Sequence, residues 1–72
     1  MHERIRGLRQ DRDLSEKEMA AILHIGQTTY SDYELGKINI PIETLKNIAL
    51  FFHTSVDYLL ELTDRREPYN DR

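Results

Sequence analysis

The chain has 72 residues, of which 39% are hydrophobic and 32% are charged, and its formal net charge is −3 at pH 7. This length fits one small domain, and the composition is typical of a helical globule rather than of a disordered segment. The absence of cysteine excludes disulfides and thiolate metal sites. The longest apolar run, residues 48–52, falls far short of the ~20 residues that span a bilayer. The N-terminus has no signal-peptide pattern either, so we expect a soluble, cytoplasmic protein with no membrane partner.

Apolar residues recur at helical spacing along the chain, and the first two expected helices lie before residue 24. The first covers roughly residues 2–12, where Ile5 and Leu8 lie three positions apart. The second begins after Ser15, because the Ser15 hydroxyl and the Glu18 carboxylate can each accept a hydrogen bond from the other residue's backbone N–H. The inner face of this second helix carries Met19, Ala20 and Leu23.

A short break separates the second helix from the third. His24 lies in this break and is expected to adopt the left-handed conformation, which His tolerates better than most residues other than glycine. The third helix covers about residues 27–35, with Tyr30 and Tyr33 turned toward the core. Gly36 is expected to end it in a left-handed conformation, which costs glycine nothing.

Two further helices and a tail complete the expected architecture. Pro41 fits the first turn of the fourth helix, where a missing N–H is no loss. The apolar face of this helix carries Ile42, Leu45, Ile48, Ala49 and Phe52. Ser55 is expected to cap a fifth helix. The fifth helix ends among Leu59, Leu60 and Leu62. We therefore expect a domain over residues 1–62 and a frayed, polar C-terminal tail over residues 63–72.

Several runs of the sequence together resemble the Xre/Cro/phage-repressor family of helix-turn-helix domains. These runs are LSEKEMAAIL at residues 14–23, residues 30–34, Gly36-Lys37, IETL at residues 42–45 and SVDYLL at residues 55–60. The resemblance extends over residues 4–62 without a gap. It implies an all-α, compact five-helix, lambda-repressor-like domain, whose helix-turn-helix is formed by the second and third helices.

The same resemblance implies a sequence-specific DNA-binding regulator of transcription, in which helix 27–35 lies in the major groove. Exposed residues early in this recognition helix then face the base edges of double-stranded DNA. They are Gln27, Thr28, Ser31 and Asp32. A Gln amide can bond bidentately to adenine, a Thr methyl can contact the thymine methyl, and an Asp carboxylate can accept from cytosine N4. The other DNA-binding candidates are Lys37 and Asn39 in the following loop and Glu16 and Lys17 in the helix before the turn.

A structural ion pair also follows from the resemblance. In this family an Arg of the first helix pairs with a Glu at the end of the recognition helix, and Arg9 and Glu34 occupy these positions. A buried pair of this kind fixes register more than it stabilises. The alternative is that Arg9 is one of several arginines on a solvated face.

A domain this short contacts few base pairs, so useful specificity requires two copies. We expect a homodimer on an inverted repeat whose half-sites lie about 34 Å apart. Candidate dimer contacts are Phe51, Tyr58, Leu62 and Tyr69, which are apolar beyond what the core requires. The alternative for each is peripheral core packing. Repression by occluding the operator is the simplest mechanism for such a chain.

A protein-binding module, such as an antitoxin or an assembly component, is the alternative function. The sequence pI of about 5.5 favours this alternative. So does Glu16, which stands where the family commonly has a phosphate-contacting Gln and which repels the DNA backbone. The Gly36-Lys37 loop and the polar Gln27 and Thr28 favour DNA.

No set of residues indicates catalysis. The three histidines, at positions 2, 24 and 53, share no metal-ligand spacing, and no nucleotide-binding glycine motif occurs. A small helical domain also has little room for an enclosed ligand pocket. We therefore expect neither an enzyme activity nor a metal, cofactor or small-molecule ligand.

Overall fold

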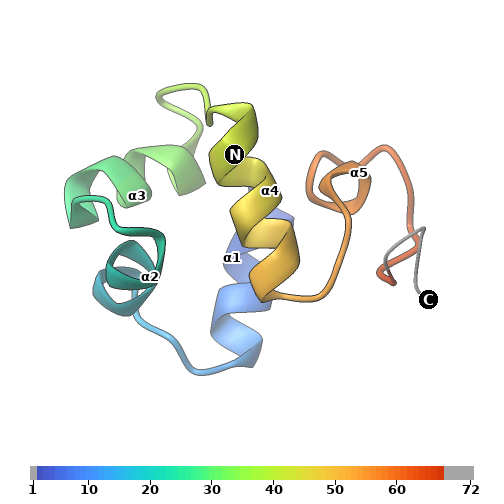
Figure 1. Cartoon of the computed structure of the whole chain (residues 1–72), viewed down its shortest axis with the longest axis horizontal. Coiled ribbons are helices and arrows are strands. Elements are labelled where there is room, and N and C mark those ends of the chain that lie inside the picture. The colour runs from blue at the N-terminus through green and yellow to red at the C-terminus, as the bar shows by residue number, and fades with distance from the viewer. Residues whose placement is uncertain (1, 68–72) are drawn as a thin grey trace.

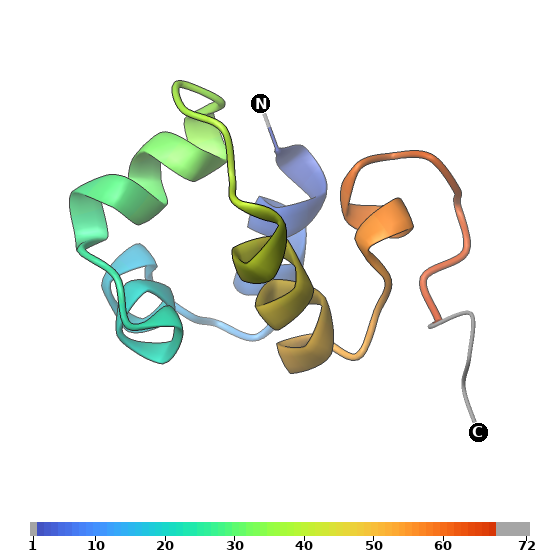
Figure 2. The same cartoon turned by 45° about the horizontal axis from the view of Figure 1, so that its top comes forward.

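In the computed structural model, which describes residues 2–67, the chain forms five helices and no strand (Figure 1). The helices are α1 (Glu3–Asp11), α2 (Glu16–Leu23), α3 (Gln27–Leu35), α4 (Ile42–Phe51) and α5 (Val56–Leu59). The pair α2 and α3 lies at one end of the long axis and α5 at the other, with α1 and α4 between them (Figures 1 and 2). The expected all-α, five-helix architecture is confirmed.

The core lies between the helices and takes side chains from all five. Its members are Ile5, Leu8, Met19, Ala20, Tyr30, Leu45, Ile48, Ala49, Phe52 and Leu59. Burying one large side chain of this kind stabilises a fold by about 1.5–3 kcal/mol. The most deeply buried of them include Met19 of α2, Tyr30 of α3 and Ile48 of α4. The same core therefore fixes the helix-turn-helix pair on α4.

The start of α4 differs from the expectation. Pro41 precedes the helix as its N-cap, with φ −58° and ψ 147°, and does not form part of its first turn. Ile42 was expected in the core but is 60% exposed, because it is the first residue of the helix and lies beyond its buried stripe. That stripe begins one turn later, at Leu45, and continues at helical spacing through Ile48 to Phe52.

The end of the domain also differs from the expectation. The fifth helix is a single turn that ends at Leu59, and Leu62 is 72% exposed. The expectation of a frayed tail is wrong for residues 63–67, which hydrogen bonds hold against the helices. The Arg4 guanidinium of α1 donates to the Asp64 carboxylate at 3.0 Å, and the buried Thr54 hydroxyl donates to the Arg66 carbonyl.

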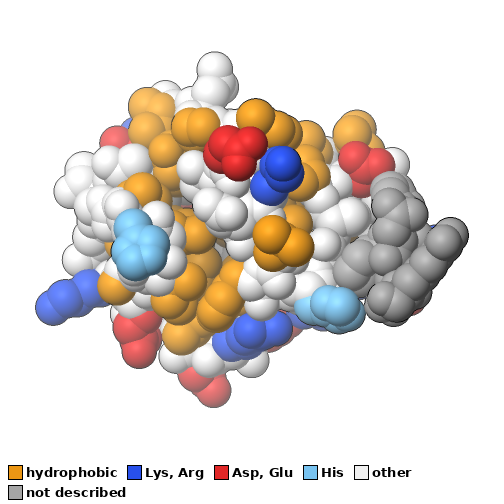
Figure 3. Space-filling view, viewed as in Figure 1, with side chains coloured by type: hydrophobic (Ala, Val, Ile, Leu, Met, Phe, Trp, Pro, Cys, Tyr) orange, Lys and Arg blue, Asp and Glu red, His pale blue; other side chains and the backbone are white. Residues whose placement is uncertain are grey.

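Several large apolar side chains remain on the surface. They are Ile22, Leu35, Ile38, Ile42, Leu50, Leu60 and Leu62. Figure 3 shows apolar side chains gathered over α4 and toward α2 and α3 on one face of the molecule. Within residues 2–67, no helix combines the length and the apolar character that crossing a bilayer requires.

Candidate nucleic-acid interface

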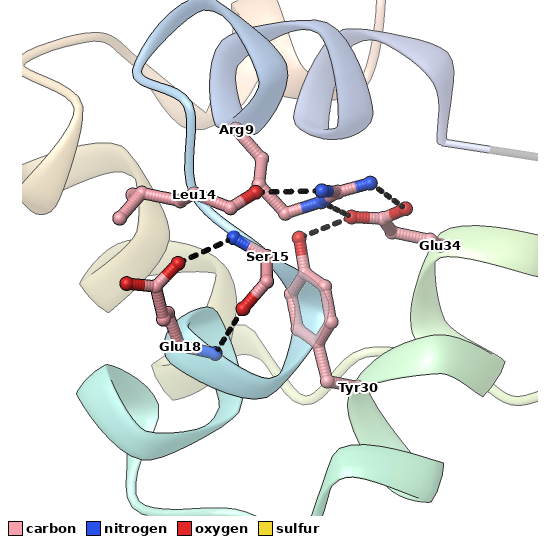
Figure 4. Close-up of polar contacts among 6 residues, drawn as sticks. All are labelled: Arg9, Leu14, Ser15, Glu18, Tyr30 and Glu34. Atoms are coloured by element: carbon pink, nitrogen blue, oxygen red, sulfur yellow. Dashed lines mark hydrogen bonds and ion pairs between the residues drawn. The ribbon is translucent and has the colours of Figure 1, made fainter.

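The first helix of the helix-turn-helix starts at a fully formed capping box, as the sequence predicted. The Ser15 backbone N–H donates to the Glu18 carboxylate at 2.8 Å, and the Glu18 N–H donates to the Ser15 hydroxyl at 3.0 Å (Figure 4). The backbone hydrogen bond from Ser15 stabilises the charged carboxylate and lowers the pKa of Glu18. Because the cap satisfies two backbone donors, α2 begins at a defined residue.

The turn between α2 and α3 has the left-handed geometry that the sequence predicted. His24 ends α2 with φ 58° and ψ 42°. The Ile25 N–H then donates to the Ala20 carbonyl at 2.9 Å, and the Ile25 side chain packs against the core. Gly26 follows in an extended conformation as the N-cap of α3. At the other end of α3, Gly36 has φ 75°, a conformation that favours glycine.

A buried polar network joins α3 to α1 (Figure 4). The Arg9 Nε donates to Glu34 Oε2 at 2.6 Å and Nη2 donates to Glu34 Oε1 at 3.3 Å, so the pair is bidentate. Arg9 Nη1 also donates to the Leu14 carbonyl at 2.7 Å, directly before α2. The Tyr30 hydroxyl donates to Glu34 Oε2. This network ties α3 to α1 and to the segment that leads into α2.

The environment of the network favours one protonation state for each of its donors. The hydrogen bond to Glu34 raises the pKa of Arg9, which stays charged. Burial, together with the hydrogen bond to Glu34, raises the pKa of the Tyr30 hydroxyl, which stays protonated and can donate. Among the described residues, no buried side-chain nitrogen or oxygen lacks a partner.

Sequence reasoning placed Tyr30 in the core but missed its role in this network. Tyr30 and Glu34 lie four positions apart, which puts both side chains on one helical face. That spacing was a usable signal.

The outer face of α3 borders a concavity of about 430 Å³. Its lining residues are Glu16, Gln27, Thr28, Ser31, Asp32, Leu35 and Lys37. The residues from α3 follow one another at helical spacing, which places them on one face. The structure therefore brings together six of the eight DNA-binding candidates. Lys17 and Asn39 are exposed but do not line this concavity.

The concavity presents a mixed set of polar groups. Gln27, Thr28 and Ser31 offer groups that can both donate and accept, whereas Lys37 only donates. The carboxylates of Glu16 and Asp32 only accept when ionised. With two carboxylates and one ammonium, the lining carries more negative than positive charge.

A second hollow, of about 170 Å³, adjoins the first and shares Glu16 and Leu35 with it. The rest of its lining comes from the start of the chain and from α3, and comprises His2, Glu3, Arg6, Arg9 and Glu34. The exposed Arg6 is a cation that sequence reasoning did not place near the site. Within the part of the chain that the structure describes, no three His, Asp or Glu side chains are arranged to hold a metal ion.

The candidate dimer residues have different environments. Phe51 is half-buried and packs edge-to-face on Phe52, with 4.9 Å between the ring centroids. Tyr58 is half-buried, and the Arg4 guanidinium lies 4.4 Å from the centroid of its ring. Leu62 is largely exposed, and Tyr69 lies outside the described residues. Of the described candidates, Leu62 therefore offers the most free apolar surface.

Comparison with known proteins identifies the family. The Helix-turn-helix family matches residues 5–59, which include all five helices except the first two residues of α1. The chain belongs to this family, as the Xre-like pattern of its sequence predicted.

Several curated relatives are regulators of transcription. The HTH-type transcriptional regulator YobD of Bacillus subtilis is 33% identical over 70 residues, which cover 97% of this chain and 62% of YobD. The cryptic phage CTXphi transcriptional repressor RstR of Vibrio cholerae is 35% identical over 79% of this chain and 51% of RstR. The HTH-type transcriptional regulator DdrOP3 of Deinococcus deserti is 41% identical over 82% of this chain and 46% of DdrOP3. The chain thus spans about half to three-fifths of the length of these relatives.

Proposed function

We propose that this chain is a sequence-specific DNA-binding regulator of transcription that reads the major groove with α3. The observation that supports the proposal is the concavity beside α3, where Gln27, Thr28 and Ser31 lie together on one helical face. Their side chains can donate to and accept from base edges. The regulator names of the relatives support the same function.

In the proposed complex, the contacts divide into reading and positioning contacts. Gln27 lies in the first turn of α3 and can form two hydrogen bonds to adenine. Thr28 can contact a thymine methyl group. The exposed Lys17, Lys37 and Asn39 flank α3 and act on phosphates, which sets the register of the protein on the duplex.

The buried network contributes by holding α3 in place before DNA arrives. Arg9 connects Glu34 of α3 to the Leu14 carbonyl, at the start of the helix-turn-helix. A recognition helix that is already fixed pays less conformational entropy on binding. Affinity therefore depends on this network, although none of its members reads a base.

We further propose that two copies bind an inverted repeat and repress transcription by occluding the operator. Two-fold symmetry of the protein then matches the symmetry of the site. The exposed Leu62, with the exposed Leu60 two residues before it in the chain, is the apolar surface that would seat the second copy, and the half-buried Phe51 and Tyr58 are further candidates. Tyr69, the remaining candidate, lies outside the described residues. We propose that this regulator acts in the cytoplasm.

Selection from random-sequence DNA at two salt concentrations tests the proposal. We expect the purified chain to recover an inverted repeat, with an affinity that falls steeply as salt rises. Gln27→Ala should then weaken binding by about 1–3 kcal/mol and relax one position of the motif. Gln10→Ala, a matched change at an exposed position of α1, should leave binding unchanged.

The alternative function, a protein-binding module, predicts a different result in the same experiment. A folded sample would then recover no sequence above background, at either salt concentration. The excess of carboxylates in the concavity favours this alternative, because a basic protein partner would complement it. The base-reading groups on the same face favour DNA.

A further inference from the structure

The two carboxylates of the concavity, those of Glu16 and Asp32, are available to accept hydrogen bonds. Among residues 2–67, neither the Glu16 nor the Asp32 carboxylate forms a hydrogen bond or an ion pair. Glu16 is close enough to Arg9 to raise the pKa of its guanidinium, but that guanidinium is already occupied by Glu34 and by the Leu14 carbonyl. A group that fits this concavity must therefore bring donors to both carboxylates or leave them unpaired.

Asp32 lines the same concavity as the residues that are proposed to read bases. Asp32 follows Thr28 by one helical turn and adjoins Ser31, and all three line the concavity. The backbone beside it is fixed, because the Lys37 N–H donates to the Asp32 carbonyl at 3.0 Å. Asp32 is therefore held where Gln27 and Thr28 are proposed to meet the bases.

The hydrogen-bonding groups that each base presents in the major groove determine from which base a carboxylate can accept a hydrogen bond. Guanine presents only acceptors and thymine presents an acceptor and a methyl group, so neither offers a donor to a carboxylate. Cytosine presents a single donor, its N4 amino group. Adenine presents an amino donor beside the N7 acceptor, a pattern that an amide matches and a carboxylate does not.

On the assumption that the proposed function is correct, we propose that Asp32 selects a cytosine in each half-site, and that Asp32 and Glu16 together suppress binding to other DNA. A wrong base leaves the Asp32 carboxylate desolvated without a donor, which is costly. On non-specific DNA both carboxylates face phosphates and repel them. Asp32 thus raises the ratio of specific to non-specific affinity, because only the specific site supplies its donor, whereas Glu16 lowers the affinity for all DNA.

Asp32→Asn tests the base preference directly, because it replaces one carboxylate oxygen by an amino group of similar size. In the selection experiment, the wild-type motif should contain a cytosine that the D32N motif replaces by adenine, the base that an Asn amide reads. Exchanging that cytosine in the wild-type operator should weaken binding by about tenfold or more. The same exchange should not weaken binding by D32N.

The repulsion by both carboxylates is tested with DNA that lacks the motif. D32N and Glu16→Gln should each bind it several-fold more tightly than the wild type at low salt, and the difference should shrink as salt screens the charges. Glu67→Gln is the matched control, since Glu67 is exposed and belongs to the segment after α5, which lies at the opposite end of the molecule from α3 (Figure 1). It removes the same charge and should change neither the motif nor the affinity.

The possible outcomes separate this inference from the function on which it rests. If wild type and D32N select the same motif, Asp32 reads no base and the inference is wrong, while the regulator function stands. If D32N or E16Q binds motif-free DNA no better than E67Q does, the suppression of non-specific binding is also wrong. If the wild-type chain selects no motif at all, the proposed function fails, and the inference fails with it.

Discussion

Two carboxylates on the same helix, Asp32 and Glu34, have opposite environments although they lie two residues apart. Glu34 is 6% exposed and accepts hydrogen bonds from Arg9 and from Tyr30. Asp32 is partly exposed and has no side-chain partner among the described residues. A two-residue step turns a side chain through more than half of a helical turn, so one faces α1 and the other faces the concavity.

One of the two carboxylates therefore helps to hold α3 in place, and the other is available to a ligand. The buried carboxylate is satisfied inside the molecule and serves the fold. The open carboxylate has unused hydrogen-bonding capacity, and its proposed role is recognition. Substitutions in the Glu34 network should therefore affect the stability of the fold, and substitutions of Asp32 should affect the selectivity of DNA binding.

The largest effect is expected from Arg9→Met, which keeps most of the apolar stem but removes the charge. Glu34 would then be buried without its cation, and the free energy of unfolding should fall by about 3–5 kcal/mol. Urea unfolding followed by circular dichroism measures this change. Arg6→Met is the matched control, because Arg6 is exposed on the same helix, and it should change stability by no more than about 0.5 kcal/mol. Equal losses for the two variants would contradict the role assigned to the pair.

A smaller loss is expected from Tyr30→Phe, which removes only the hydroxyl. Glu34 would keep both hydrogen bonds from Arg9 but lose its third donor, so stability should fall by about 1–2 kcal/mol. The buried ring keeps its packing in this variant. Comparison with Tyr33→Phe, which alters a buried tyrosine of the same helix, separates the network from a general effect of losing a hydroxyl.

The Tyr30 hydroxyl also makes the stability of the protein depend on pH. Burial and the hydrogen bond to Glu34 raise the pKa of Tyr30 above the ordinary value of about 10. Folding therefore favours the protonated form, so this contribution is fully present below about pH 10 and is lost as the pH rises above it. From about pH 10 to about pH 11, the wild type should lose about 1 kcal/mol more stability than Y30F. Urea midpoints of both proteins across this range measure the difference, and parallel curves would contradict it.

The smallest effect on stability is expected for Asp32, the carboxylate that has no side-chain partner among the described residues. Asp32→Asn removes a charge that has no side-chain partner in the described structure, so the free energy of unfolding should stay within about 0.5 kcal/mol of the wild type. Thermal unfolding of the purified variant measures this. A large loss of stability would mean that Asp32 supports the fold, and its effect on DNA selection would then have a structural cause.

The sequence determined the features that depend on residues close together in the chain. The capping box at Ser15 and Glu18, the left-handed His24 and Gly36, and the Ser55 cap were all predicted from local patterns and are present. Each involves backbone groups within a few residues of the side chain that satisfies them, so local chemistry suffices. The family resemblance added the position of the Arg9 and Glu34 pair, which composition and spacing could not supply.

Packing of the helices against one another produced the remaining features, which local patterns did not predict. It buried the Tyr30 hydroxyl against Glu34, left Ile42 exposed at the start of α4, and held residues 63–67 through Arg4 and Thr54. It also gathered Glu16 of α2 with the outer face of α3, while Lys17, its neighbour in the chain, stayed outside the concavity. These outcomes depend on contacts between distant segments, whose geometry is set by the shared core and not by local spacing.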